Sequence, residues 1–124
     1  MLPDSSLVAF LPSADLDRAR TFFESVLELP LVEQTPFACV FSCRGTTFRV
    51  TDVGEYRPAP FTVLGWEVPD IVETCERLAS RGVMFERYSE LEQDQRGVWT
   101  TPGGDYVAWF KDADGNVLSI TELT

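Results

Sequence analysis

The sequence KDADGNVLSI at residues 111–120 decides the fold of the second half of the chain. Its Asp-Gly-Asn segment at 114–116 is a strong turn former, because glycine adopts positive φ without strain and Asp and Asn bond their own backbone. Apolar runs flank the turn, YVAWF at 106–110 and VLSITEL at 117–123, so we expect a β-hairpin. Side chains alternate along a strand, so Ser119 points away from the face of its two apolar neighbours. The function depends on what that opposite face contacts.

A strand and a helix are expected before this hairpin. The run at 61–68 is typical of a strand, and Asp70 is placed to cap a helix that Gly82 ends. Glu73 completes a capping-box pattern with Asp70. Apolar residues recur at helical spacing in this helix: Ile71, Cys75, Leu78 and Ala79. The remaining segments of this half are predicted strands at 83–88 and 98–101 around a polar loop at 89–97.

The first half shows the same order of elements. A short apolar strand at 7–11 is followed by Asp15, which is placed to cap a helix that Pro30 ends. The helix has an apolar stripe of Leu16, Ala19, Phe22, Phe23, Val26 and Leu27. Two strands follow, at 37–43 and 46–53, joined by a tight Arg44-Gly45 hairpin, and a further strand is expected without an assigned position.

The repeated order predicts one α+β domain, residues 1–124, made of two modules. The modules span about 5–53 and 61–123, and a Pro/Gly-rich linker, GEYRPAP at 54–60, joins them. Each half is too small to bury a sheet face well by itself, so pairing of the halves is physically reasonable.

Composition excludes several classes of partner. The chain of 124 residues has a formal net charge of −10, which disfavours nucleic acid and anionic membranes. No apolar run approaches the roughly 18 residues that a membrane span needs. The N-terminal sequence lacks the features of a signal peptide, so we expect a cytoplasmic protein. The three cysteines, Cys39, Cys43 and Cys75, are expected to be reduced and to pack as small apolar residues.

Three segments together resemble the vicinal oxygen chelate superfamily: SADLDRARTFFESVLELP, WEVPDIVETCERLASRGV and WFKDADGNVLSI. That group includes glyoxalase I, extradiol dioxygenases, fosfomycin-resistance enzymes and bleomycin-binding proteins. The family has Asp-Pro-Asp-Gly-Asn near its end, and here Ala113 replaces the proline. The resemblance implies two βαβββ modules whose curled mixed sheets enclose a cavity, with the helices outside. Such a fold does not fix the function, because it serves both enzymes and binding proteins.

The resemblance also implies where metal ligands would lie. The positions that match the family's ligands hold Val8, Arg49, Val63 and Ser119. A catalytic metal needs about three imidazole, carboxylate or thiolate ligands, and this chain contains no histidine. Valine has no lone pair to donate, and the arginine cation repels a metal. We therefore expect no metal and no other cofactor.

Strand alternation assigns residues to the expected cavity. Phe48 and Val50 are apolar enough to face the helix, so Arg49 between them faces the cavity. The predicted ligand-binding residues are Val8, Phe10, Thr47, Arg49, Val63, Val107, Trp109 and Ser119. This set suits a mostly apolar organic molecule that carries an acceptor or an anionic group.

The leading hypothesis is a metal-independent small-molecule binding protein of the glyoxalase/bleomycin-resistance type, which sequesters a drug or a metabolite. One alternative is a metal-independent lyase or isomerase that uses Glu67, Tyr106 or Cys39 as acid or base. Another is a divalent-metal glyoxalase or dioxygenase with an atypical site. The sequence identifies no catalytic residue, and it leaves open whether any reaction is catalysed. We expect a homodimer, because the family commonly forms one and because exposed sheet edges need covering.

Overall fold

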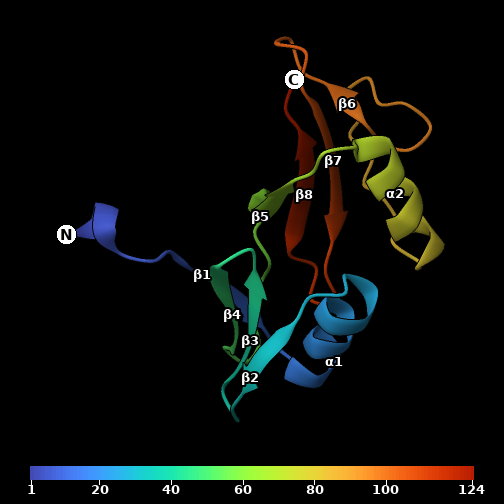
Figure 1. Cartoon of the computed structure of the whole chain (residues 1–124). Helices are drawn as coiled ribbons and strands as arrows, with labels where there is room; N and C mark the ends of the chain where they lie inside the picture. The colour runs from blue at the N-terminus through green and yellow to red at the C-terminus, as the bar shows by residue number, and fades with distance from the viewer. The chain divides into compact units, whose positions relative to one another are not determined.

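A computed structural model describes residues 1–124, which divide into two compact units, Met1–Arg57 and Pro58–Thr124. Each unit contains one four-stranded mixed sheet (Figure 1). In each, the chain order is strand, helix and three further strands. This order confirms the predicted α+β class with two βαβββ modules. Neither unit has a helix with the length and hydrophobicity needed to cross a lipid bilayer.

The sheet of the first unit has the strand order β1-β4-β3-β2, and β1 runs parallel to β4. The strands are β1 (Val8–Ser13), β2 (Leu31–Gln34), β3 (Ala38–Cys43) and β4 (Thr46–Asp52). The helical elements are a short 3-10 turn, η1 (Leu2–Asp4), the α-helix α1 (Leu16–Arg20) and its π-helical continuation η2 (Thr21–Val26). Strand β2 is the one to which the sequence assigned no position.

Helix α1 begins as the sequence indicates. The Asp15 side chain accepts a hydrogen bond from the Arg18 amide at 3.1 Å, which satisfies one free donor of the first turn. The continuation η2 is wider, and the Leu27 amide donates to the Phe22 carbonyl. The chain leaves the helix before Pro30, at Glu28, which adopts a left-handed φ of 60°.

A cluster of phenylalanine rings forms the core of the first unit. Phe23 lies 5.6 Å from Phe41 and 5.5 Å from Phe48 between ring centroids, and Phe41 and Phe48 stack at 5.3 Å. All three are buried, as are Leu11 and Val50 of the same sheet face. This face therefore packs against the helix, and alternate residues of β1 and β4 lie on the other face.

The sheet of the second unit has the strand order β5-β8-β7-β6, and β5 runs parallel to β8. The strands are β5 (Thr62–Glu67), β6 (Trp99–Thr100), β7 (Tyr106–Lys111) and β8 (Val117–Glu122). Strands β7 and β8 form the expected hairpin. In its turn, Asp112 accepts hydrogen bonds from the Asp114 amide and from both the backbone and the side-chain amide of Asn116.

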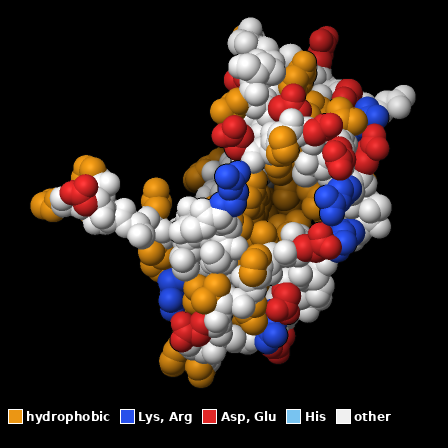
Figure 2. All heavy atoms as spheres, viewed as in Figure 1, with side chains coloured by type: hydrophobic (Ala, Val, Ile, Leu, Met, Phe, Trp, Pro, Cys, Tyr) orange, Lys and Arg blue, Asp and Glu red, His pale blue; other side chains and the backbone are white.

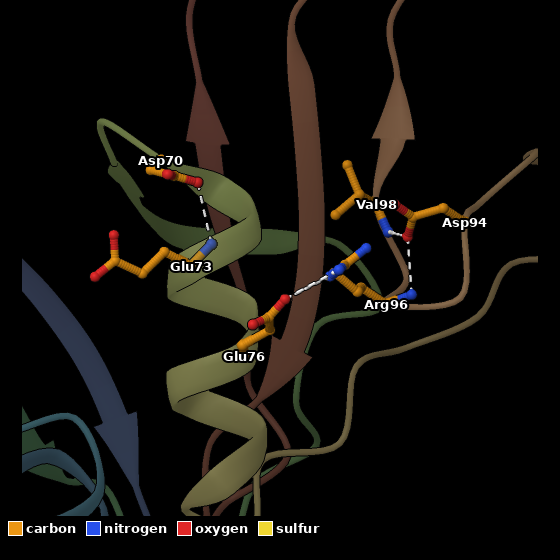
Figure 3. Close-up of polar contacts among 6 residues, drawn as sticks. All are labelled: Asp70, Glu73, Glu76, Asp94, Arg96 and Val98. Carbon is orange, nitrogen blue, oxygen red and sulfur yellow. Dashed lines mark hydrogen bonds and ion pairs between the residues drawn. The ribbon is translucent and has the colours of Figure 1, made fainter.

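Helix α2 (Ile71–Ser80) packs Ile71 and Cys75 against the sheet. Asp70 caps it by accepting a hydrogen bond from the Glu73 amide at 3.1 Å (Figure 3). The Glu73 side chain extends away from Asp70, so the reciprocal half of the predicted capping box is absent. Another free donor of the first turn is satisfied from β8, where Glu122 accepts a hydrogen bond from the Ile71 amide at 2.9 Å.

The prediction of a strand at 83–88 is wrong. This segment forms only a single bridge, between Phe85 and Phe110. Just after the bridge, the Gln93 side chain forms hydrogen bonds with backbone groups that would otherwise be available to a neighbouring strand. It accepts a hydrogen bond from the Tyr88 amide and donates one to the Glu86 carbonyl. The segment therefore continues as an irregular loop along the edge of β7.

Candidate ligand-binding faces

Each sheet has a face opposite its helix, which we call its open face. In the first unit, the open face includes Val8 and Phe10 of β1 and their direct partners on β4, Thr47 and Arg49. Direct partners point to the same side of a sheet, so these four side chains are neighbours. Phe10 is 67% exposed, which is high for a phenylalanine in a strand. This face therefore presents apolar groups beside a cation.

Within its unit, the Arg49 side chain makes no hydrogen bond and no ion pair, although it is half-buried. Its strand partners are Phe10 and Val40, both apolar. A partly desolvated guanidinium without a carboxylate is unfavourable, and an anion or acceptor from outside the protein would relieve that cost.

In the second unit, Trp109, Ser119 and Gly65 lie in register across β7, β8 and β5, on the open face. The Trp109 indole Nε1 donates a hydrogen bond to Thr62 Oγ1 at 3.1 Å. Because β8 lies between the strands of these two residues, the indole lies across β8. The Trp109 side chain thus covers part of the open face, and its hydrogen bond to Thr62 attaches it to the edge strand β5.

Two more aromatic residues meet Trp109, and we call Tyr88, Trp99 and Trp109 the aromatic cluster. The ring centroids of Trp99 and Trp109 are 6.1 Å apart with planes tilted by 33°. Tyr88 stands perpendicular to Trp109 at 5.3 Å. All three are half-buried. Tyr88 and Trp99 were absent from the predicted site, and Val107, which was predicted, is the direct strand partner of Trp99.

Ser119 lies close to Gly65, where a side chain on residue 65 would clash with its hydroxyl. A Cβ atom built on Gly65 would lie 2.5 Å from Ser119 Oγ. The Ser119 hydroxyl has no hydrogen-bond partner within the protein, and it is half-buried rather than exposed. The remaining predicted residue of this unit, Val63, lies at a β-bulge of β5 and is 38% exposed.

Gln93 fixes the loop that carries Tyr88. Its Nε2 donates to the carbonyls of Glu86 and Gly97, and its Oε1 accepts from the Tyr88 amide at 2.8 Å. Asp94 accepts from the amides of Arg96 and Val98, and Arg96 binds Glu76 of α2 at 2.9 Å (Figure 3). The position of Tyr88 against Trp109 is therefore set by side-chain hydrogen bonds.

The second unit has two notable hollows. One, of about 470 Å³, adjoins the aromatic cluster and is lined by Tyr88, Val117, Lys111 and the 58–60 segment. The larger, about 690 Å³, lies at the beginning of α2 beside the helix-facing residues Tyr106 and Glu122. Its acidic lining belongs to a surface on which carboxylates gather over α2 and the following loop (Figure 2).

The residues considered as acid or base are not brought together. Tyr106 pairs with Glu122 on the helix side of the sheet, whereas Glu67 pairs with Thr121 on the open face. Cys39 is fully buried in the first unit, and burial raises the pKa of its thiol. A thiol with a raised pKa is a poor nucleophile at neutral pH.

The residues at the family's ligand positions do not fit a metal ion. Val8, Val63 and Arg49 offer no donor, and Ser119 alone carries an oxygen. Within each unit, no three His, Cys, Asp or Glu side chains gather closely enough to hold a metal.

The sequence matches the Glyoxalase/Bleomycin resistance protein/Dioxygenase superfamily over residues 7–120. The chain belongs to this superfamily. The family explains why both units share one order of elements, since its members are built from βαβββ modules. No curated protein sequence matches the chain.

Solved structures share the fold at low sequence identity. The chain is similar to a superfamily member from Sphaerobacter thermophilus DSM 20745, with 20% identity, a TM-score of 0.76 and coverage of 99% of this chain and 100% of that one. A lactoylglutathione lyase from Agrobacterium tumefaciens has 19% identity to this chain and a TM-score of 0.75, and the match covers 97% of this chain and 94% of that one. TnmS3, an antibiotic binding protein from Streptomyces sp. CB03234, has 19% identity and a TM-score of 0.74, and the match covers 100% of this chain and 99% of that one.

Proposed function

We propose that this protein binds a small organic molecule at the open faces of its sheets and does so without a metal. The observation that carries the proposal is Arg49, a half-buried cation among apolar strand partners whose side chain pairs with no group of its own unit. A ligand with a carboxylate or another acceptor would supply the missing partner. Sequestration of a drug or a metabolite is the activity that fits such a site, and TnmS3 is a relative in fold described as antibiotic binding.

The proposed contacts are shared between apolar and polar side chains. Arg49 and Ser119 supply donors, and the apolar residues supply the contact area that small-molecule sites require. The full set is Val8, Phe10, Thr47, Arg49, Val63, Val107, Trp109 and Ser119. In this proposal, the modules 5–53 and 61–123 act as one functional domain. The protein is a homodimer located in the cytoplasm.

The donor set supports metal independence. The alternative is a divalent-metal glyoxalase or dioxygenase with an atypical site, and the same fold is found in a lactoylglutathione lyase. Elemental analysis of protein purified without chelators tests it directly. We expect much less than one equivalent of Zn, Ni, Fe or Mn per chain, and about one equivalent would overturn this part of the proposal.

The ligand proposal is tested by thermal shift against a library of metabolites and antibiotics, because a true ligand stabilises the folded state by mass action. Hits are expected among apolar molecules that carry a carboxylate or a similar acceptor. Arg49→Ala should then weaken binding by about 1.5–3 kcal/mol, the range for a hydrogen bond to a charged group.

Arg57→Ala is the matched control, because Arg57 is exposed and its substitution removes the same charge. Equal losses in both variants would show that only net charge matters. Full affinity in Arg49→Ala would remove Arg49 from the site.

A further inference from the structure

The aromatic cluster of the second unit has more order than an apolar wall requires. Three rings from separate segments meet, and two of them, Trp99 and Trp109, have planes within 33° of each other. The Trp109 indole is held at Thr62 by its only N–H donor. Tyr88 is held by the Gln93 hydrogen bond to its amide. The Trp109 ring is therefore fixed in orientation, and the backbone that carries Tyr88 is fixed in position.

We propose that this cluster binds a flat, conjugated ring system, whose edge acceptor receives a hydrogen bond from the Ser119 hydroxyl. The inference rests on the proposed function and specifies the class of ligand for one of its faces. Aromatic rings gain attraction from offset stacking or edge-to-face contact beyond the area they bury, and a puckered ring cannot make the same contacts. A cluster with two rings tilted by 33° and a third perpendicular to Trp109 offers flat aromatic surfaces, which favour a flat partner.

The Gly65 and Ser119 pair provides the polar edge of this site. A Cβ on residue 65 would lie 2.5 Å from Ser119 Oγ, so glycine keeps the approach to the hydroxyl open. Ser119 is the direct strand partner of Trp109, which places the hydroxyl beside the indole. Since no protein group binds this hydroxyl, it is free to donate to a carbonyl or ring oxygen of a ligand.

A matched pair of probes separates flatness from hydrophobicity. Naphthalene-2-carboxylate and decahydronaphthalene-2-carboxylate have the same carbon skeleton and the same charge, but only the first is flat. The equal charge also cancels any effect of Glu67, which lies on the same face. Decahydronaphthalene is the more hydrophobic skeleton, so a site selected only for apolar contact would prefer it.

We expect calorimetry to show that the flat probe binds roughly 3- to 10-fold more tightly, as stacking of this strength predicts. Trp109→Leu should abolish this preference, because it weakens the flat probe more than the saturated one. A cooperative urea unfolding transition shows that the variant is folded. Trp66→Leu is the control, because Trp66 pairs with buried Ile120 on the helix face, and it should keep the full preference.

The outcomes distinguish this inference from the proposed function. If both probes bind equally, the inference is wrong, and the proposed function still stands if Arg49→Ala weakens binding of a ligand found by the library screen. The same conclusion follows if Trp109→Leu retains the preference, or if Trp66→Leu loses it. If neither probe binds at its solubility limit, the inference is wrong, and the library screen decides the proposed function separately.

Discussion

Ser119 and Gly65 show how one missing side chain shapes the candidate site. We predict that Gly65→Ala lowers the free energy of unfolding by about 1 kcal/mol. The new Cβ would meet Ser119 Oγ at 2.5 Å, and overpacking of this kind typically costs 1–3 kcal/mol. The smaller conformational entropy of the unfolded alanine chain offsets about 0.4–1 kcal/mol of that loss. Urea unfolding of the two proteins measures the difference.

Removal of the hydroxyl supplies the control for this clash. In a Ser119→Ala background, the nearest remaining atom would be the residue 119 carbonyl oxygen at 3.3 Å. Gly65→Ala should then have an effect near zero. An equal loss in both backgrounds would mean that Ser119 Oγ is not the obstacle.

The cysteines allow a second prediction for individual residues. Burial raises the pKa of Cys75 to about 11, whereas Cys43 is half-exposed near the end of β3. At pH 8 only about one Cys75 thiol in a thousand is ionised, and the thiolate is the reactive form. We expect a colorimetric disulfide reagent to label the native protein rapidly at Cys43 alone.

Cys43→Ser should remove the fast labelling phase, and denaturant should restore reaction at the other cysteines. Cys39 is expected to behave as Cys75 does, because burial also raises the pKa of its thiol. Rapid labelling of native Cys43→Ser would contradict the burial of these thiols.

At the scale of elements, sequence patterns predicted what depends on local chemistry. The Asp15 and Asp70 caps and the β7–β8 hairpin are formed by side chains that bond backbone within a few residues. The strand at 83–88 was predicted from its apolar residues. The prediction is wrong because the Gln93 side chain forms hydrogen bonds with backbone groups of this segment. A bond of that kind has no periodicity in the sequence.

The same difference explains which site residues could be predicted. Alternation along β4 and β8 was sufficient to assign Arg49 and Ser119 to faces opposite buried neighbours. Tyr88 could not be found this way, since it lies on the irregular loop and meets Trp109 only through tertiary structure. Thr62 was missed because the bulge in β5 interrupts the alternation that would have placed it.

The loop carrying Tyr88 yields a prediction for an element. We expect Gln93→Ala to increase amide hydrogen exchange of residues 86–98, because it removes three hydrogen bonds that hold this loop. Glu76→Ala is the control, since it breaks only the exposed pair with Arg96, worth less than about 1 kcal/mol. Unchanged exchange in Gln93→Ala, or an equal rise in the control, would contradict this role for Gln93.

At the scale of the whole molecule, exposed strand edges and a large charge act in opposite directions. Strands β1 and β5 are edge strands, and they carry exposed Phe10 and Val63, beside exposed Val8 and Phe61. Apolar edges favour pairing with a second copy. A net charge of −10 on each copy opposes it by mutual repulsion.

We therefore predict a homodimer that becomes stronger as ionic strength rises. Salt screens the repulsion between two acidic chains over about 10 Å at 0.1 M, and it leaves apolar contacts intact. Sedimentation at low and physiological salt should show a shift from monomer toward dimer. Phe10→Glu should favour the monomer at both, whereas Met84→Glu adds the same charge at an exposed residue outside every strand and should retain the dimer. Dissociation of the wild-type dimer by salt would instead indicate that charged pairs hold the copies together. A monomer under all conditions would show that the predicted homodimer does not form.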